Sequence, residues 1–567
     1  MLIFKKILRK LRRFDYFWLF KGNVINIQEH HKQWIALADE RRFNEAIKLC
    51  LATIDNPKEI FLASAFLGYA YFQISNYELA VAYLESAVKK NPSDYYSIFF
   101  LARSLQMIGR NNEALGLFTT CCRNHPTHVE EILALALPLA LEIKESSESI
   151  NFFNESQLWL DNKLLSPTLV AKVLFFQERD KELQEKINDQ AVVSFRRIYS
   201  VADWAPKSGG VFHVLGEPEP IRIVTPPEND ETTIHETLVY SNIPYVAEIP
   251  DVLITSGSSL IFIENDIVLS DLLADKQYGH FASFQYDKTV VAQRCDALLV
   301  KAIQPSEWLT EGILLSGLAS EHYGHWFAEF LPKLRHFERH PRFAEIPLII
   351  DDGMPASHYD FLRALVANPL HILLRGTSLK VGTLLVAPTT TFFPVELFPN
   401  HSVPAEHQAS WTVSALRYLG DKINHHFGEV NTASDRVFLS RKNSTWRRLV
   451  NEDEVIKELK SLGFRVVFLE ECNFEEQVRI FQTAELIVAP NGSALNSLIF
   501  SNKNINVLIF GQKNPHNWGG WLGPMMDLGY NPIFLSGDPI GDEGNKHSDY
   551  TISIDKVRKI VMEMLKD

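Results

Sequence analysis

Polar side chains recur at helical spacing in the stretch SGLASEHYGHWFAEFLPKLRHFE, residues 316–338. His322, His325 and Glu329 are three and four residues apart, and Lys333 follows one turn later. A helix that presents His and Glu one turn apart supplies candidate general bases, so these three are candidate catalytic residues. The alternative is an amphipathic helix whose His and Glu are solvated or cap its ends. A zinc site is disfavoured because the H-E-x-x-H order is absent.

A group of four cations lies in FLSRKNSTWRRLVNEDEV, residues 438–455. We expect a strand to end at Ser440-Arg441, a polar loop to carry Arg447-Arg448, and a helix to begin at Asn451. Ligands of open α/β sheets bind at the carboxyl ends of strands, and guanidinium groups offer bidentate donors to phosphate. The cluster therefore predicts a diphosphate site. The alternative is a basic surface loop paired with Glu452 and Asp453.

The third candidate stretch is LIVAPNGSALNSLIF, residues 486–500. An apolar strand breaks at Pro490-Asn491-Gly492-Ser493 and a helical pattern follows, which predicts free backbone N–H groups and a positive helix end facing an anion. The stretch lacks both the G-x-G-x-x-G dinucleotide pattern and the Walker A pattern.

The chain has no Asp-x-Asp triplet. Enzymes that hold a nucleotide diphosphate through a divalent metal commonly use such a carboxylate pair. Its absence leaves Arg, Lys and helix N-termini to neutralise a leaving diphosphate, so we expect no metal and no cofactor.

Length and charge limit the possible classes of protein. A chain of 567 residues is too long for one core, and a formal net charge of -13 argues against a general nucleic-acid binder.

Residues 1–24 are basic and amphipathic, without the pattern of a secretory signal, and suit contact with an anionic membrane surface. The alternative is a helix docked on the next domain. The five cysteines form no C-x-x-C pair, so a cytoplasmic protein is the simplest expectation, peripheral on the inner face of the membrane where residues 1–24 bind it.

An internal repeat occupies residues 27–126. Ala46, Ala80 and Ala114 are spaced by 34 residues, and prolines recur at a matching period. Small residues at this period are typical of tetratricopeptide repeats, whose paired helices approach closely. Residues 127–190 also have a helical pattern. We therefore predict an all-α, tetratricopeptide-like solenoid with a helical cap over 27–190, which would bind a protein partner or act as a spacer.

After residues 202–210 the chain changes to short β-rich runs, and residues 244–271 predict strands that alternate with turns. From about residue 312, apolar runs such as IPLIIDDG, ELIVAP and NINVLIFG are separated by helical patterns. This alternation is typical of a doubly wound parallel α/β sheet. The proline-containing segment 389–408 predicts a linker, which divides this part into domains at 208–400 and 409–567.

Together the three candidate stretches resemble glycosyltransferase family 61. HYGHWFAEFLPKL is similar to the family's His-x-x-His-Trp…Leu-Pro block, SRKNSTWRRLVNEDEV to its Ser-Arg…Arg-x-x-x-Asn-Glu block, and APNGSALNSLIF to its block His-Gly-Ala-x-Leu-Thr-Asn-x-x-Phe. The resemblance covers roughly residues 210–567. It implies a GT-B-like pair of Rossmann-like domains, with the acceptor side first and the nucleotide-sugar side second.

The resemblance also implies the activity: inverting, metal-independent transfer from a nucleotide sugar to a glycan acceptor, in bacteria a capsular or other surface polysaccharide. The implied nucleotide-sugar residues are listed here: Ser440, Arg441, Arg447, Arg448, Asn451, Asn491, Gly492, Ser493, Ala494 and Asn496. Asn491 stands where the family has His and cannot act as a base. Two alternatives are an inactive scaffold that binds partners through its repeats and a protein O-glycosyltransferase.

Overall fold

The computed structural model divides the chain into two compact units, residues 1–194 and 195–567. The residues that the structure describes are 29–53, 60–143, 146–160, 165–188, 192–208, 210–225, 235–264, 266–274, 279, 282–389, 391–392, 410–430, 434–444, 447–502, 504–513, 522–540 and 548–566. The basic segment 1–24 and residues 390 and 393–408 of the expected linker lie outside them. The domain boundaries inside the second unit remain predictions.

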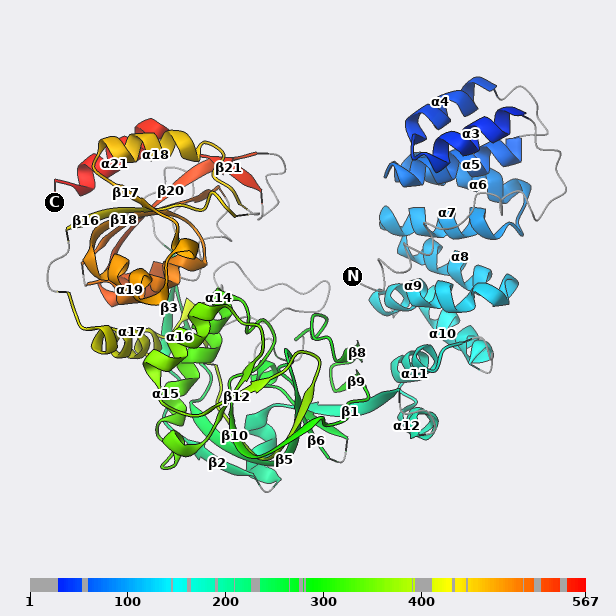
Figure 1. Ribbon diagram of the computed structural model, residues 1–567. Coiled ribbons are helices and arrows are strands. Elements are labelled where there is room, and N and C mark those ends of the chain that lie inside the picture. The colour runs from blue at the N-terminus through cyan, green and yellow to red at the C-terminus, as the bar shows by residue number, and fades with distance from the viewer. Residues whose placement is uncertain are drawn as a thin grey trace. The chain divides into compact units, whose positions relative to one another are not determined.

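The described part of the first unit consists of helices (Figure 1). Its described helices are α3 (Glu29–Asp39), α4 (Phe43–Thr53), α5 (Ile60–Gln73), α6 (Tyr77–Lys90), α7 (Tyr95–Met107), α8 (Asn111–Asn124), α9 (Val129–Glu142), α10 (Ser147–Trp159), α11 (Pro167–Phe176) and α12 (Asp180–Asn188). The first six form three helix pairs, which confirms the predicted repeats.

Small residues lie where paired helices touch. Ala46, Ala80 and Ala114 are each fully buried, as the 34-residue period predicts. At Gly68 in α5, a Cβ atom would lie 2.3 Å from Leu84 Cγ of α6, so only glycine permits this approach. Among the cysteines, Cys121 is buried in the helix core, consistent with a packing role.

The second unit contains an eleven-stranded sheet of order β12-β11-β10-β13-β5-β6-β7-β1-β9-β8, with β2 beside β5. Its strands are β1 (Val193–Tyr199), β2 (Val211–Val214), β5 (Tyr245–Thr255), β6 (Ile261–Ile263), β7 (Ile267–Leu269), β8 (Val290–Gln293), β9 (Ala297–Lys301), β10 (Glu307–Leu314), β11 (Leu348–Asp351), β12 (Leu370–Leu373) and β13 (Ser378–Val386). Short helices α13 (Val201–Trp204), α14 (Tyr323–His325) and α15 (Leu334–Phe337), and the longer α16 (Ala356–Leu365), accompany it.

This sheet is mixed: the parallel pairing expected from about residue 312 is found among β10–β13, and the antiparallel strands come earlier in the chain. Strands β12, β11, β10 and β13 are parallel neighbours. β5 then pairs antiparallel with β13, β2 and β6, and β6 with β7. The short turns between β5, β6 and β7 force antiparallel pairing, because a parallel pair needs a crossover of a dozen or more residues.

A six-stranded sheet of order β17-β16-β18-β19-β20-β21 follows. Its strands are β16 (Asp435–Leu439), β17 (Arg465–Val467), β18 (Ala484–Pro490), β19 (Asn506–Gln512), β20 (Asn531–Ile540) and β21 (Asp549–Thr551); all neighbours are parallel except β20 and β21. The helices are α17 (Val413–Phe427), α18 (Glu452–Ser461), α19 (Phe474–Thr483), α20 (Leu522–Leu528) and α21 (Ile554–Met564).

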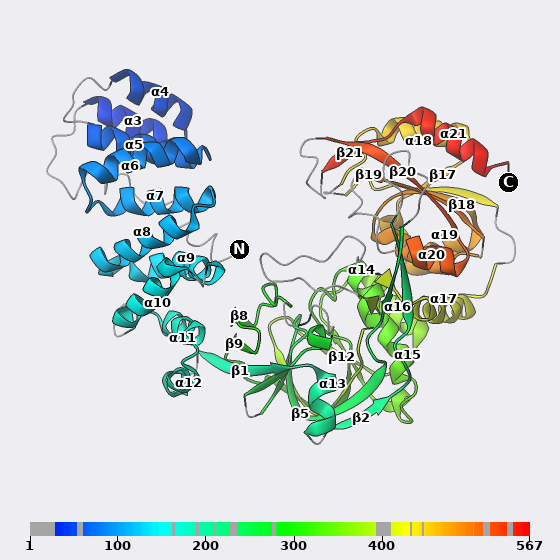
Figure 2. The same ribbon diagram turned by 180° about the vertical axis from the view of Figure 1, so that it is seen from behind.

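Helices cover both faces of this sheet. α18 and α21 lie on one face and α19 and α20 on the other (Figures 1 and 2). Along β16 the side chains alternate: Phe438 packs with the α18/α21 core, whereas Val437 and Leu439 pack with the opposite core. The predicted doubly wound arrangement is therefore found here.

One hydrophobic core runs through both sheet regions of the second unit. It includes Phe327 and Phe330 of the segment after α14, Leu416 of α17, and Val478 of α19.

The hairpin β3 (Pro220–Thr225) and β4 (His235–Tyr240) packs against α20, where a Cβ on Gly523 would lie 1.9 Å from the Arg222 carbonyl oxygen. The small ladder β14 (Thr391–Phe392) and β15 (Ser410–Trp411) completes the strands. None of the helices in the described ranges is long and apolar enough to span a bilayer.

Candidate active site

The 316–338 segment is helical, but it changes helix type along its length. After α14 comes a π-helical turn, Trp326–Phe330, then a 3-10 turn, Leu331–Lys333, and then α15. Pro332 has no N–H to donate and cannot continue a regular α-helix, and the wider turn before it accommodates this. Trp326 and Phe327 are fully buried and anchor the segment. Its polar residues are therefore carried by an irregular, rigidly packed helix.

A buried carboxylate holds the loop that leads into this segment. Asp351, at the end of β11, accepts hydrogen bonds from Ser316 Oγ at 2.8 Å, Gly317 N at 3.0 Å, Ser320 Oγ at 2.7 Å and Gly257 N at 2.9 Å. These four donors all bond to one side chain. Residues 316–320 are thus fixed just before His322.

His325 and Glu329 form a direct pair through Nδ1 and Oε1, one helical turn apart. His322 caps the helix, and its Nδ1 accepts from Gly324 N at 3.2 Å. Partial burial, followed by the neighbouring His325, lowers the pKa of His322. A neutral imidazole that accepts at Nδ1 carries its proton on Nε2, so His322 presents a donor there.

Two arginines of the cation cluster lie half-buried near each other. Burial, followed by the charge of Arg447, lowers the pKa of Arg441, and burial lowers that of Arg447. Arg441 donates to Asn491 O at 2.5 Å and to Ser444 Oγ at 3.1 Å. Among the described residues neither guanidinium forms an ion pair, and the buried Nε of Arg447 has no hydrogen-bond partner. Such a pair of cations suits an anionic ligand.

The backbone at Arg447 is unusual, with a φ of 54° in the left-handed region. This conformation is uncommon for a residue with a long side chain and persists only where the surroundings impose it. It comes just before the bridge that Leu449 makes with Tyr550.

Three other predicted donor-site residues are used inside the protein. Arg448 forms an ion pair with Asp549 through Nε at 3.0 Å and Nη2 at 2.6 Å. The Asn451 side chain bonds the backbone of Ile552, and Ser440 Oγ donates to Glu452. In this structure they connect the loop to the rest of the fold rather than leaving polar groups for a ligand.

The 490–500 turn lies directly beside Arg441. At Gly492 a Cβ atom would be 2.9 Å from Arg441 Nη1, so the guanidinium packs on the bare backbone. A 3-10 helix, Ser493–Phe500, follows β18 where a helix was expected. Asn491, Ser493 and Ala494 are partly exposed, whereas Asn496 is buried.

The helical segment and this turn meet. A Cβ on Gly324 would lie 3.2 Å from Ser493 Oγ, and Tyr323 Oη is 2.9 Å from Ser497 Oγ. His322 is close enough to Arg447 for that charge to lower its pKa further. The structure thus gathers the His/Glu residues, the arginine pair and the glycine turn, which are far apart in the sequence.

Comparison with known proteins identifies one region of the chain. Residues 323–508 match the family described as Glycosyltransferase 61. This region is a glycosyltransferase family 61 domain. Such a domain makes the protein an enzyme that transfers a sugar from a donor to an acceptor. No curated protein matches the chain.

Part of this chain also matches solved structures. A MamA fragment (41-end) from Desulfovibrio magneticus RS-1 is 16% identical, with 24% of this chain and 75% of that chain covered and a TM-score of 0.21. YrrB, described as a TPR protein with an unusual peptide-binding site, is 16% identical over 26% of this chain and 73% of its own, with a TM-score of 0.21. The helix pairs described above, rather than these matches, identify the repeats.

Several residues that organise the candidate site were not among the predicted site residues. Asp351 could have been suspected, because it follows the buried strand run Leu348–Asp351 at a carboxyl end. Tyr323 and Ser497 carry no sequence signal, since their contact joins positions 174 residues apart.

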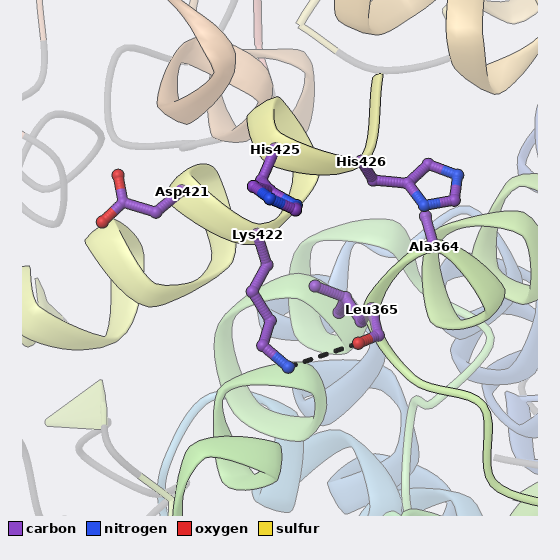
Figure 3. Close-up of a pocket in the computed structure, with 6 residues that line it drawn as sticks. All are labelled: Ala364, Leu365, Asp421, Lys422, His425 and His426. Carbon is purple, nitrogen blue, oxygen red and sulfur yellow. Dashed lines mark hydrogen bonds between the residues drawn. The ribbon is translucent and has the colours of Figure 1, made fainter. Parts of the chain in front are cut away.

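The surface pockets lie outside this constellation. One of about 420 Å³ is lined by residues of α16 and α17, where Lys422 Nζ lies 3.4 Å from the Leu365 carbonyl oxygen (Figure 3). A second of about 620 Å³ is lined by residues that include Glu217, Arg335 and Tyr418. In the described part of the chain, no group of three His, Cys, Asp or Glu side chains is placed to hold a metal ion.

Proposed function

We propose that the glycosyltransferase is an inverting enzyme that needs no metal ion and acts from a GT-B-like pair of domains. The donor is a nucleotide sugar, and the acceptor is a growing surface polysaccharide of the capsular or O-antigen type, at the inner face of the plasma membrane. The observation that supports this best is the arginine pair Arg441 and Arg447. Neither has an ion-pair partner in the described structure; Arg447 acts on His322 of the helical segment, and Arg441 packs on Gly492.

Proton removal is assigned to the His325–Glu329 pair. Glu329 accepts the Nδ1–H of His325, which orients the imidazole and leaves it basic at Nε2. His325 takes the proton of an acceptor hydroxyl as the oxygen attacks the anomeric carbon. Attack from the face opposite the leaving diphosphate inverts that carbon.

The leaving diphosphate is stabilised by fixed positive groups. Arg441 and Arg447 supply two permanent charges, and the backbone N–H groups near Gly492 and Ser493 supply further donors. His322 adds an Nε2–H donor on the same side. Because these groups are already held in place, they stabilise the developing charge without rearranging.

The arginine assignment is tested by nucleotide binding. Arg441→Ala and Arg447→Ala should each weaken UDP or GDP binding by roughly ten- to a hundredfold, since a hydrogen bond to a charged group is worth about 1.5–3 kcal/mol. Arg448→Ala is the matched control, because its guanidinium is committed to Asp549. Calorimetry that gives equal affinities for all three variants would remove the phosphate role.

The activity is tested by a screen of nucleotide sugars for donor hydrolysis and transfer, with and without EDTA. We expect release of a nucleoside diphosphate from one donor class, unchanged by EDTA. Binding of a nucleotide without any release would instead support the inactive scaffold, for which Asn491 is the motivating residue. Transfer to peptides but not to glycans would support the protein O-glycosyltransferase.

A further inference from the structure

Two consecutive residues of α14 touch the 3-10 helix that follows the glycine turn. Tyr323 Oη lies 2.9 Å from Ser497 Oγ, within hydrogen-bond distance. A Cβ atom on Gly324 would lie 3.2 Å from Ser493 Oγ, so the bare glycine backbone packs on that hydroxyl. The two serines lie about 8 Å apart along the 3-10 helix, at a rise of about 2 Å per residue. Because the contacts are separated along this helix, they fix the orientation of α14 as well as its distance.

The α14 side of these contacts leads directly to the two imidazoles. Gly324 N donates to His322 Nδ1 at 3.2 Å, and His325 is the last residue of α14. The ring centroids of the two histidines are 5.2 Å apart. Any shift of Tyr323 and Gly324 would therefore move both candidate catalytic histidines.

The other side of these contacts leads to the candidate anion site. Ser493 follows Gly492, whose backbone packs on the Arg441 guanidinium. Ser497 is only 1% exposed, so water does not compete for its hydroxyl. Burial raises the pKa of Tyr323 to about 12, so the phenol stays neutral near pH 7 and keeps this hydrogen bond. One short chain of contacts thus joins the arginine to the histidines.

We propose that Tyr323 is a positioning residue: its hydrogen bond to Ser497 holds the two histidines in register with the glycine turn, so that a diphosphate bound beside Arg441 lies at a fixed distance from the candidate base. This role deepens the proposed function and rests on it for its catalytic meaning. Reacting groups held about 1 Å out of place can lose about 10²-fold in rate. Binding of the diphosphate itself depends on the arginines and the turn, so it should be much less sensitive to Tyr323.

The first test removes a single oxygen atom. Tyr323→Phe keeps the ring, which packs on Phe327 and His358 at centroid distances of 6.2 Å and 5.8 Å. The kcat of the full chain should fall about 10- to 100-fold, while the affinity for UDP or GDP, whichever the unaltered chain binds, changes less than about twofold. Ser497→Ala should cause the same loss. The double variant should lose no more than either single variant, because all three lack the same hydrogen bond.

Tyr530→Phe is the matched control. Tyr530, which precedes β20, donates from Oη to Leu498 O at 2.8 Å, so this variant removes a buried tyrosine hydrogen bond to the same 3-10 helix. Its melting temperature should fall about as far as that of Tyr323→Phe, but its kcat should equal that of the unaltered chain. Equal turnover of the two variants would overturn the role of Tyr323, since lost stability would then explain both.

A second measurement does not depend on turnover. In the full chain labelled with ¹³C-histidine, the bound nucleotide should shift the NMR signals of His322 and His325, which are assigned by their absence in His322→Gln and His325→Gln. Tyr323→Phe should still bind the nucleotide but lose most of these shifts, whereas Tyr530→Phe should keep them. If Tyr323→Phe fails to fold, Ser497→Ala takes its place in both measurements.

The two measurements separate the role of Tyr323 from the proposed function. A chain that binds the nucleotide but transfers no sugar would refute the proposed function, and the histidine shifts would then decide the role of Tyr323 alone. A working transferase whose histidine signals do not respond to the nucleotide, or respond equally in Tyr323→Phe, would refute only the role of Tyr323. A chain that binds neither UDP nor GDP would refute both.

Discussion

At the residue scale, the partner of each side chain decides its role. Arg447 and Arg448 are adjacent in sequence, yet Arg448 is paired with Asp549 while Arg447 has an unpartnered buried Nε among the described residues. The same contrast separates Glu329, bonded to His325, from Glu321, which is exposed on the loop nearby. Two residues of the same type can therefore have different roles, depending on their partners.

Replacement of Glu329 by Gln should abolish most transfer but leave nucleotide binding intact. Gln cannot stabilise the imidazolium that forms when His325 takes the proton, and loss of assisted proton transfer typically costs about 10²–10⁴-fold in rate. Turnover and UDP affinity are measured side by side. Glu321→Gln serves as the control and should behave as the unaltered enzyme; near-normal turnover of Glu329→Gln would exclude it from proton transfer.

At the element scale, two close contacts set the shape of the site. The loop 316–320 is tied to β11 through Asp351, and the 490–500 turn is pressed against Arg441 at Gly492. Neither contact involves the candidate base His325, but each fixes an element that carries site residues. Substitutions in these two elements should therefore change the stability of the second unit and the affinity for nucleotide to different extents.

Asp351→Asn should destabilise the second unit. An amide has one acceptor oxygen in place of two, so at least one of the four buried donors loses its partner, at a cost of about 1–3 kcal/mol. Denaturant unfolding measures this loss. Asp352→Asn, at the adjacent and less buried position, is the control. Equal stability of the two variants would contradict the role of Asp351 in holding the loop.

Gly492→Ala should weaken nucleotide binding with little loss of stability. The added Cβ meets the end of a flexible side chain, the Arg441 guanidinium at 2.9 Å, which can move aside. Gly420→Ala is the contrasting control, since its Cβ would lie 2.5 Å from the Ile499 carbonyl oxygen and the backbone must shift. Calorimetric affinity and the melting temperature are compared; a stability loss in Gly492→Ala as large as that in Gly420→Ala would refute this reading.

At the scale of the whole molecule, the chain has two compact units, each with its own hydrophobic core. All candidate site residues lie between 322 and 496, within the second unit. The helical unit contributes none of them. It is available for other contacts, such as the protein partner expected for helical repeats.

Heating the full chain should therefore give two unfolding transitions, and UDP should raise only one of them. A ligand at a hundredfold excess over its Kd stabilises the unit that binds it by about 2.7 kcal/mol. Scanning calorimetry with and without UDP measures both transitions. In Arg441→Ala the UDP shift should shrink. An equal shift of both transitions would contradict a site confined to the second unit.

Much of the local organisation was predictable from the sequence. The 34-residue spacing of small residues determined the helix pairs, because their close approach requires small side chains at fixed positions. Apolar runs with helical patterns between them determined the strands and helices of the α/β part. The residue types at 322–329, 441–447 and 491–493 were sufficient to suggest the chemistry and the family. All of these patterns lie within short stretches of sequence.

Only the tertiary structure decided the pairing of distant residues. Strand runs alone do not reveal direction, so the antiparallel partners of β5 were not predictable from them. The contact between Arg448 and Asp549 joins positions 101 residues apart. Which cation remains available to a ligand, and which is used within the fold, is set by these long-range contacts. Local sequence patterns do not encode them, because many partners are locally equivalent and the folded chain brings only some of them together.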